Sequence, residues 1–151
     1  SAGDLPYRAV LHAVGPSMGE GDEQGKVMLA VSRCLKLCSM HDWDSIAFPA
    51  ISTGFFNVPV DVVAKGFFHA ISSFWDARLE EPPSKIIICL TEDNFQPFFN
   101  AFREASMTPG EAGHSLQLTT RDESEMETGI VELDDADISA LEDDDVNEWF
   151  K

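Results

Sequence analysis

Residues 48–59 read Phe-Pro-Ala-Ile-Ser-Thr-Gly-Phe-Phe-Asn-Val-Pro, and this stretch decides what the rest of the chain must build. It passes from an apolar run, through Ser, Thr and Gly, into a segment that Pro59 opens as a helix. Small and hydroxyl-bearing residues between a strand and a helix let backbone amides approach a phosphate, and the helix dipole favours its negative charge. The stretch therefore predicts a phosphate-binding loop. A tight turn that merely needs Gly54 is the structural alternative.

Apolar patterns on both sides of this loop predict alternating strands and helices. Short apolar runs indicate strands at 7–14, 45–51 and 85–90. Apolar residues three and four apart indicate helices at 23–40, 59–79 and 94–105. The run at 85–90 is continuously apolar, which is typical of a strand covered on both faces. The alternation predicts an α/β fold with a mostly parallel sheet, whose exposed edge needs a partner.

Four blocks of sequence carry a family pattern. They are Leu-His-Ala-Val-Gly-Pro at 11–16, Ser-Ile-Ala-Phe-Pro-Ala-Ile-Ser-Thr-Gly at 45–54, Asp-Val-Val-Ala at 61–64 and Ile-Ile-Ile-Cys-Leu at 86–90. In this order and spacing they resemble the macro domain, over about residues 2–105 and in its C-terminal portion only. The resemblance implies a three-layer α/β/α fold that binds ADP-ribose along the C-terminal ends of the strands, in keeping with the rule for open α/β sheets.

The resemblance implies ligand-binding roles for seven residues, taken position by position: Ser52, Thr53, Gly54, Phe55, Phe56, Asn57 and Phe95. The family segment that matches residues 52–56 wraps the diphosphate and the distal ribose. Phe56 matches an aromatic residue that packs on the ribose, with a hydrophobic loop anchor as the alternative. Phe95 lies near the family's adenine-stacking aromatic residue, while its place in a helical stripe of Phe residues favours core packing.

Two loop positions depart from the family pattern. Asn57 stands where the family usually has Gly, and Val58 stands where it usually has an aromatic residue. We expect Asn57 to restrict the loop if position 57 requires a positive φ, although Asn tolerates that conformation better than most residues. Both departures favour a weakened ligand loop.

The remaining residues predict no catalytic centre. The resemblance implies that a complete domain has roughly 60 to 70 further residues before Ser1, which hold the adenine and the proximal ribose. The catalytic groups of family hydrolases come largely from that region, so they would lie outside this chain. We interpret His12 as structural. Cys34 and Cys38 are one helical turn apart without a second pair of ligands, so we predict no metal site and no cofactor besides the ADP-ribose ligand.

The charge is distributed unevenly along the chain. Asp and Glu number 27 against 10 Lys and Arg, for a net charge of −17. Residues 1–110 hold 13 acidic and 8 basic side chains, whereas residues 111–151 hold 14 and 2. We therefore expect a partial macro-like domain at 1–110 and an acidic extension at 111–151. The extension is either solvated or docked, with candidate strands at 114–119 and 129–133 and a candidate helix at 137–150.

Composition also bears on partners and location. The acidic excess opposes binding to duplex nucleic acid, which attracts clustered Lys and Arg. No apolar run approaches the ~20 residues that span a bilayer, so we expect no membrane partner. Three cysteines in apolar surroundings favour a reducing, intracellular location, cytoplasmic or nuclear.

Three functions remain open from the sequence. The first is recognition of ADP-ribose or of an ADP-ribosylated protein. The second is a non-binding macro-like interaction or assembly module, in which a protein partner completes the sheet or binds the acidic extension. The third is an ADP-ribosyl hydrolase whose catalytic residues lie outside this chain.

Overall fold

A computed structural model describes residues 2–77 and 83–107 of the chain. Residues 2–12 are described apart from the compact unit that begins at Ala13. The acidic extension, with its candidate strands and helix, lies outside the described residues, as does the predicted end of the second helix beyond Ala77. No helix within the described ranges is both long and apolar enough to cross a lipid bilayer.

The compact unit alternates helices with strands, as the sequence predicts. The elements are α1 (Glu23–Met40), β1 (Ser45–Pro49), α2 (Val60–Ala77), β2 (Lys85–Cys89) and α3 (Glu92–Ser106). β1 and β2 pair in parallel, with Ile46 opposite Ile86. The α/β class and the parallel sheet are confirmed, and each helix begins within two residues of its predicted start.

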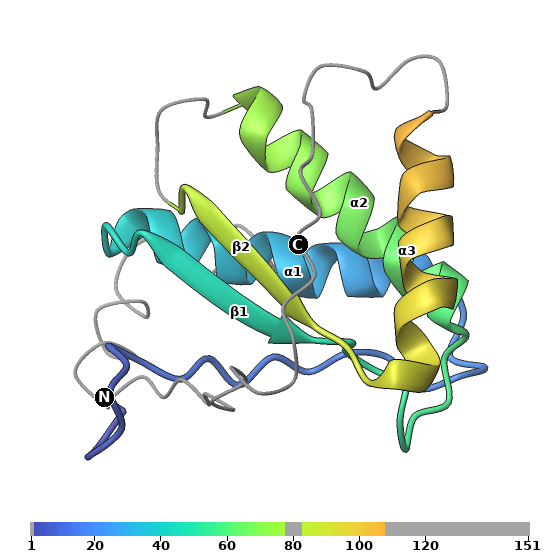
Figure 1. Cartoon of the computed structure of the whole chain (residues 1–151), viewed down its shortest axis with the longest axis horizontal. Helices are drawn as coiled ribbons and strands as arrows, with labels where there is room; N and C mark the ends of the chain where they lie inside the picture. Colours follow the sequence, from blue (N-terminus) through green and yellow to red (C-terminus); the bar gives the residue numbers. More distant parts are fainter. Residues whose placement is uncertain (1, 78–82, 108–151) are drawn as a thin grey trace. The chain divides into compact units, whose positions relative to one another are not determined.

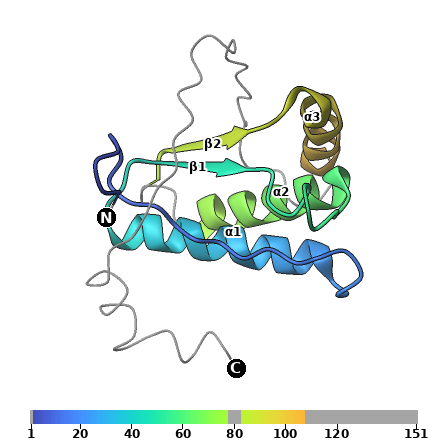
Figure 2. The ribbon, with the colours of Figure 1, turned by 90° about the horizontal axis from the view of Figure 1, so that it is seen from below.

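The helices and the strands form separate layers. α1 and α2 lie on the same side of the two strands, and α3 stands beyond the C-terminal ends of the strands (Figures 1 and 2). Ile46 and Phe48 are buried, whereas Ala47 between them is exposed. On β2, Ile87 and Cys89 are exposed too. The prediction that 85–90 is covered on both faces is therefore wrong for the described residues, because no described element packs against the outward face.

The segment 7–14 does not form the strand that its apolar run predicts. Only Val10 has the pairing of a single bridge residue, and residues 11–17 have no regular structure. The sheet of the described residues consists of β1 and β2 alone. An apolar run becomes a strand only where a neighbouring backbone offers a ladder of hydrogen bonds, and this segment lacks such a ladder.

Phe67 on α2 links three elements of the core. Its buried ring makes an edge contact with Phe48 of β1, with ring centroids 5.4 Å apart. It also contacts Phe98 of α3 at 5.7 Å. One turn of α2 therefore fixes both the strand before the 50–57 loop and the helix that follows β2.

α1 and α2 pack closely because Gly66 has no side chain. A Cβ atom at this position would lie 2.9 Å from the backbone oxygen of Gln24 and 3.0 Å from the side chain of Val27. Distances this short require the facing helix to shift, and a backbone oxygen cannot rotate away as a flexible side chain can.

We expect Gly66→Val to lower the free energy of unfolding by about 1–3 kcal/mol, because added methyl groups overpack a close helix crossing. Urea denaturation followed by circular dichroism measures this change. Ser73→Val is the matched control, since it places the same side chain at an exposed position of α2. Equal effects of the two substitutions would contradict the packing argument and indicate a helix-propensity effect alone.

Candidate functional site

Loop 50–57 joins β1 to α2, and hydrogen bonds within the loop hold part of its backbone. The amide and the hydroxyl of Thr53 both donate to the Ala50 oxygen, at 3.2 and 2.8 Å. The amide of Val58 donates to the Ser52 oxygen at 3.0 Å, and the Val58 side chain is buried in the core. The buried side chain of Val58 therefore anchors the end of the loop in the core.

Two non-glycine residues of the loop have a left-handed backbone. Ser52 has a φ of 68° and Asn57 a φ of 53°. The positive φ at position 57 is the condition under which we expected a restricted loop, and Asn is among the residues that adopt it most readily. Ser52 is less suited to this conformation, which costs on the order of 1–3 kcal/mol. The surrounding contacts must therefore hold Ser52 in place.

Gly15 presses against the back of the same loop. A Cβ atom at Gly15 would collide with the Ser52 hydroxyl and the Ile51 side chain. The Ser52 hydroxyl is buried, and it has no hydrogen-bond partner among the described residues. Gly15, near the end of the 11–16 block, thus packs directly against Ser52.

Several backbone amides of loop 50–57 are not used as donors within the described residues. Within the part of the chain that the structure describes, the amides of Ser52, Gly54, Phe55 and Phe56 donate to no acceptor. The Phe56 oxygen, by contrast, accepts from the Met18 amide at 2.9 Å. Four amides grouped within five residues, next to the start of α2, form an arrangement that can receive an anion.

The aromatic side chains of the candidate site are exposed. Phe55 is 99% exposed and Phe56 39% exposed, with ring centroids 6.0 Å apart. Phe95, in the first turns of α3, is 36% exposed and stacks on Phe99. The core-packing interpretation of Phe95 is wrong, because the buried face of α3 consists of Phe98, Ala101, Phe102 and Ala105.

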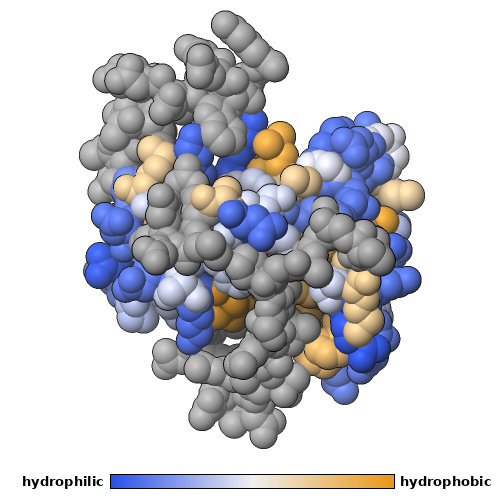
Figure 3. All heavy atoms as spheres, turned by 90° about the horizontal axis from the view of Figure 1, so that it is seen from above, coloured by the Kyte–Doolittle hydropathy of each residue, from blue (hydrophilic) through white to orange (hydrophobic). Residues whose placement is uncertain are grey.

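Hydrophobic residues also reach the surface elsewhere. On the face that Figure 3 shows, they appear in separate places among hydrophilic residues. The six predicted residues 52–57 share one loop, and Phe95 lies on a different element.

Sequence reasoning missed the loop that precedes α1. Glu20 and Glu23 bond its backbone amides through their carboxylates. The signal was present in the sequence Gly-Glu-Gly-Asp-Glu at 19–23, because acidic residues next to glycines at a helix start are placed to accept from free amides.

The two helical cysteines are buried, and their pKa values are raised. Burial raises the pKa of Cys34 to about 11, and the neighbouring Cys38 adds to the shift. Burial likewise raises the pKa of Cys38 to about 11, with a further contribution from Asp44. Residues 2–77 and 83–107 contain no group of three or more side chains that could hold a metal ion.

The sequence matches known proteins along part of its length. Residues 1–67 match the family model described as Macro domain. An O-acetyl-ADP-ribose deacetylase from Enterobacter sp. (strain 638) is 36% identical over 110 residues, which cover 72% of this chain and 61% of that protein. A protein of the same name from Escherichia coli (strain K12) is 37% identical over 95 residues, covering 62% of this chain and 53% of that protein. The chain thus spans little more than half the length of these relatives.

Solved structures share the fold. The Oceanobacillus iheyensis macrodomain with MES bound superposes with a TM-score of 0.54 at 21% identity, covering 60% of this chain and 48% of that chain. A mutant of the same macrodomain with ADPR gives a TM-score of 0.53 at 21% identity, covering 60% of this chain and 49% of that chain. At this identity the likeness establishes the fold.

We expect Ser52→Gly to raise the free energy of unfolding by up to about 1 kcal/mol, because glycine adopts a positive φ without strain. The substitution also removes a buried hydroxyl that has no described partner. Thr53→Gly is the control, since it deletes the hydroxyl bond to Ala50 and should destabilise. Urea denaturation measures both. A loss of stability in Ser52→Gly would contradict the account of strain.

We expect iodoacetamide at pH 8 to modify Cys89 well before Cys34 and Cys38. Cys89 is exposed and the other two are buried. A raised pKa leaves a smaller fraction of thiolate, so at pH 8 and a pKa of about 11 roughly one thiol in a thousand is reactive. Peptide mass spectrometry after timed quenching gives the order. Simultaneous modification of all three cysteines in the folded protein would contradict the prediction.

Proposed function

We propose that this chain, whose residues 1–67 match the family model described as Macro domain, recognises ADP-ribose, or an ADP-ribosyl group on a protein, through loop 50–57. The observation that carries this proposal is the group of four amides in loop 50–57, those of Ser52, Gly54, Phe55 and Phe56, that donate to no acceptor among the described residues. A diphosphate has several oxygen acceptors and a negative charge. Backbone amides beside a helix N-terminus bind such a group without any basic side chain.

The exposed aromatic rings support a nucleotide ligand. Phe55 and Phe56 follow the free amide of Gly54 directly, so a ligand whose diphosphate lies on the amides places its sugar within reach of a ring. Aromatic rings favour the apolar face of a ribose and stack on a base. Phe95 offers a further exposed ring on α3, which suits the adenine position that the family resemblance implies.

The acidic composition does not oppose this proposal. The binding groups are backbone dipoles, whose orientation depends on the fold and not on the net charge. The described acidic residue nearest in sequence to the loop is Asp61, in the first turn of α2. A basic patch is therefore unnecessary for a single diphosphate, although a long polyanion would still be repelled.

A second candidate function is hydrolysis of an ADP-ribose ester, and the names of the relatives favour it. Both relatives are called O-acetyl-ADP-ribose deacetylase, but this chain spans only 61% and 53% of their lengths. Hydrolysis needs a group that activates water beside the ester, and we assign that role to none of the described residues. Recognition requires only the loop.

A third candidate, an assembly module, rests on the open face of the sheet. Ala47, Ile87 and Cys89 are exposed there, and no described element covers this face of the two-stranded sheet. A protein partner that covers this face is compatible with ligand binding, because the loop lies at the C-terminal end of the strands.

We expect the chain to bind ADP-ribose in a calorimetric titration, and Gly54→Glu to weaken that binding at least tenfold. A Cβ atom at Gly54 meets nothing within 4 Å, so the substitution introduces charge without a steric clash. The new carboxylate would repel the diphosphate at short range.

Gly54→Gln is the matched control, because it has nearly the same size and no charge. We expect its effect to be clearly smaller than that of Gly54→Glu. Absence of heat with the unmutated chain, or equal affinities for all three proteins, would contradict the proposed function.

A further inference from the structure

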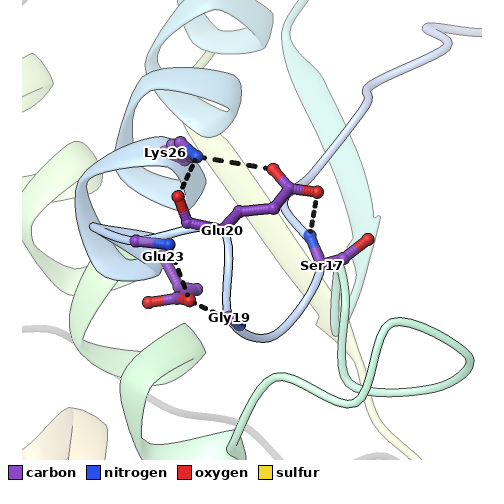
Figure 4. Close-up of polar contacts among 6 residues, drawn as sticks. Ser17, Gly19, Glu20, Glu23 and Lys26 are labelled. Atoms are coloured by element: carbon purple, nitrogen blue, oxygen red, sulfur yellow. Dashed lines mark hydrogen bonds and ion pairs between the residues drawn. The ribbon is translucent and has the colours of Figure 1, made fainter.

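The backbone amides of loop 17–21 could bind an anion, but carboxylates of Glu20 and Glu23 already accept hydrogen bonds from them. One carboxylate oxygen of Glu23 accepts from the amides of Gly19 and Gly21, at 2.8 and 3.1 Å. A carboxylate oxygen of Glu20 accepts from the amide of Ser17 at 3.0 Å (Figure 4). Backbone amides that converge on one point form a site for an anion, and here the anion is supplied by the chain itself.

The remaining amides of this loop are also bonded. The amide of Glu20 donates to the Ser17 oxygen at 3.3 Å, and that of Met18 donates to the Phe56 oxygen at 2.9 Å. All five consecutive amides from Ser17 to Gly21 thus have acceptors. A phosphate finds no free donor there, and two carboxylates would repel it.

Lys26 fixes Glu20 in this arrangement. Its ammonium group donates to the Glu20 backbone oxygen at 3.1 Å and forms an ion pair with the Glu20 carboxylate at 3.4 Å (Figure 4). Asp22 caps the start of α1 separately by accepting from Gly25. The 17–21 loop is therefore tied to the first turn of α1 at several points.

The hydrogen bond from the Met18 amide to the Phe56 oxygen connects loop 17–21 to the candidate site. Phe56 donates no backbone bond within the described residues, so its oxygen is the point at which the 17–21 loop holds it. Displacement of Met18 would release the carbonyl of Phe56. The peptide unit of Phe56 and Asn57 would then keep one hydrogen bond, from the Asn57 amide to the Gly54 oxygen at 2.9 Å, and the adjoining ring would be held less firmly.

We propose that Glu23, assisted by Glu20, is a positioning residue for ADP-ribose recognition: its carboxylate shapes loop 17–21 so that Met18 holds Phe56 and, of these two loops, loop 50–57 is the one that offers free amides. This inference rests on the proposed function. The two loops have complementary roles, because one is closed to anions by internal carboxylates and the other is left open. The diphosphate is thereby directed to the amides at 52–56.

The acidic groups keep this role over the physiological pH range. Bonds from the backbone amides of Glu23 itself, Gly21 and Gly19 lower the pKa of the Glu23 carboxyl below its ordinary value of 4.5. Bonds from Ser17 and then Lys26 lower the pKa of Glu20 in the same way. A lowered pKa means that the bonds are present above the ordinary range and are lost only as the pH falls through the lowered value. We therefore expect loop order to be constant from pH 8 to 5.5.

The test compares Glu23→Ala and Glu23→Gln with the unmutated chain. Amide hydrogen exchange by NMR reports on loop order, and calorimetry reports on ADP-ribose affinity. In Glu23→Ala we expect exchange at Gly19, Gly21 and Met18 to speed up at least tenfold. The dissociation constant should rise about fivefold, the effect of losing one typical net hydrogen bond. Glu23→Gln keeps an acceptor oxygen, and we expect it to restore part of both properties.

Two controls separate positioning from general stability. Exchange at Phe67, in the buried part of α2, should not change in Glu23→Ala, because only the surface loop is released. Asp61→Ala removes an exposed carboxylate from the first turn of another helix, and we expect its affinity for ADP-ribose to be no weaker than that of the unmutated chain.

Different results would contradict the positioning role of Glu23 and the proposed recognition of ADP-ribose. Unchanged exchange at Met18 in Glu23→Ala, or an unchanged dissociation constant with faster exchange, would overturn the positioning role alone. Absence of ADP-ribose binding by the unmutated chain would overturn the proposed function and the role in recognition together.

Discussion

The buried ring of Phe67 is the contact on which the candidate site depends. It meets Phe48 at the end of β1 and Phe98 on α3, so a single side chain relates the strand, the crossover helix and the last helix. Full burial of such a ring contributes about 1.5–3 kcal/mol, a large part of the stability of a small unit. Because loop 50–57 runs from the strand to the helix that Phe67 joins, both ends of the loop are fixed by the core.

Between those ends, the loop is rigid on one side and open on the other. Thr53 donates to the Ala50 oxygen, the Val58 amide donates to the Ser52 oxygen, and Gly15 packs against Ser52. Its forward amides stay unbonded within the described residues. The 17–21 loop beside it shows the opposite arrangement, since carboxylates satisfy its amides. Two neighbouring loops of similar small residues thus differ in whether the chain supplies its own anion.

The sequence predicts the helices well and the environment of individual side chains less well. Apolar spacing marks the buried face of α1 and α2 because the 3.6-residue period is a local property. The same stripe misplaced Phe95, since α3 buries Phe98 and Phe102 and turns Phe95 outward. The apolar run 85–90 does not reveal which faces are covered, because covering depends on elements distant in sequence. The phosphate-loop prediction placed 52–57 correctly between strand and helix, but it could not show that Val58 is an anchor or that Glu23 bonds a neighbouring loop.

The strain at Ser52 has a physical explanation in this setting. A left-handed serine with a buried, unbonded hydroxyl costs free energy that a glycine would avoid. The same backbone conformation turns the Ser52 oxygen toward the Val58 amide and leaves the amides at 54–56 without intramolecular acceptors. A loop already held in that shape loses little conformational entropy when an anion binds. The aromatic core and the packing of Gly15 against Ser52 offset this strain when the chain folds. Ligand binding therefore does not have to supply the free energy for it.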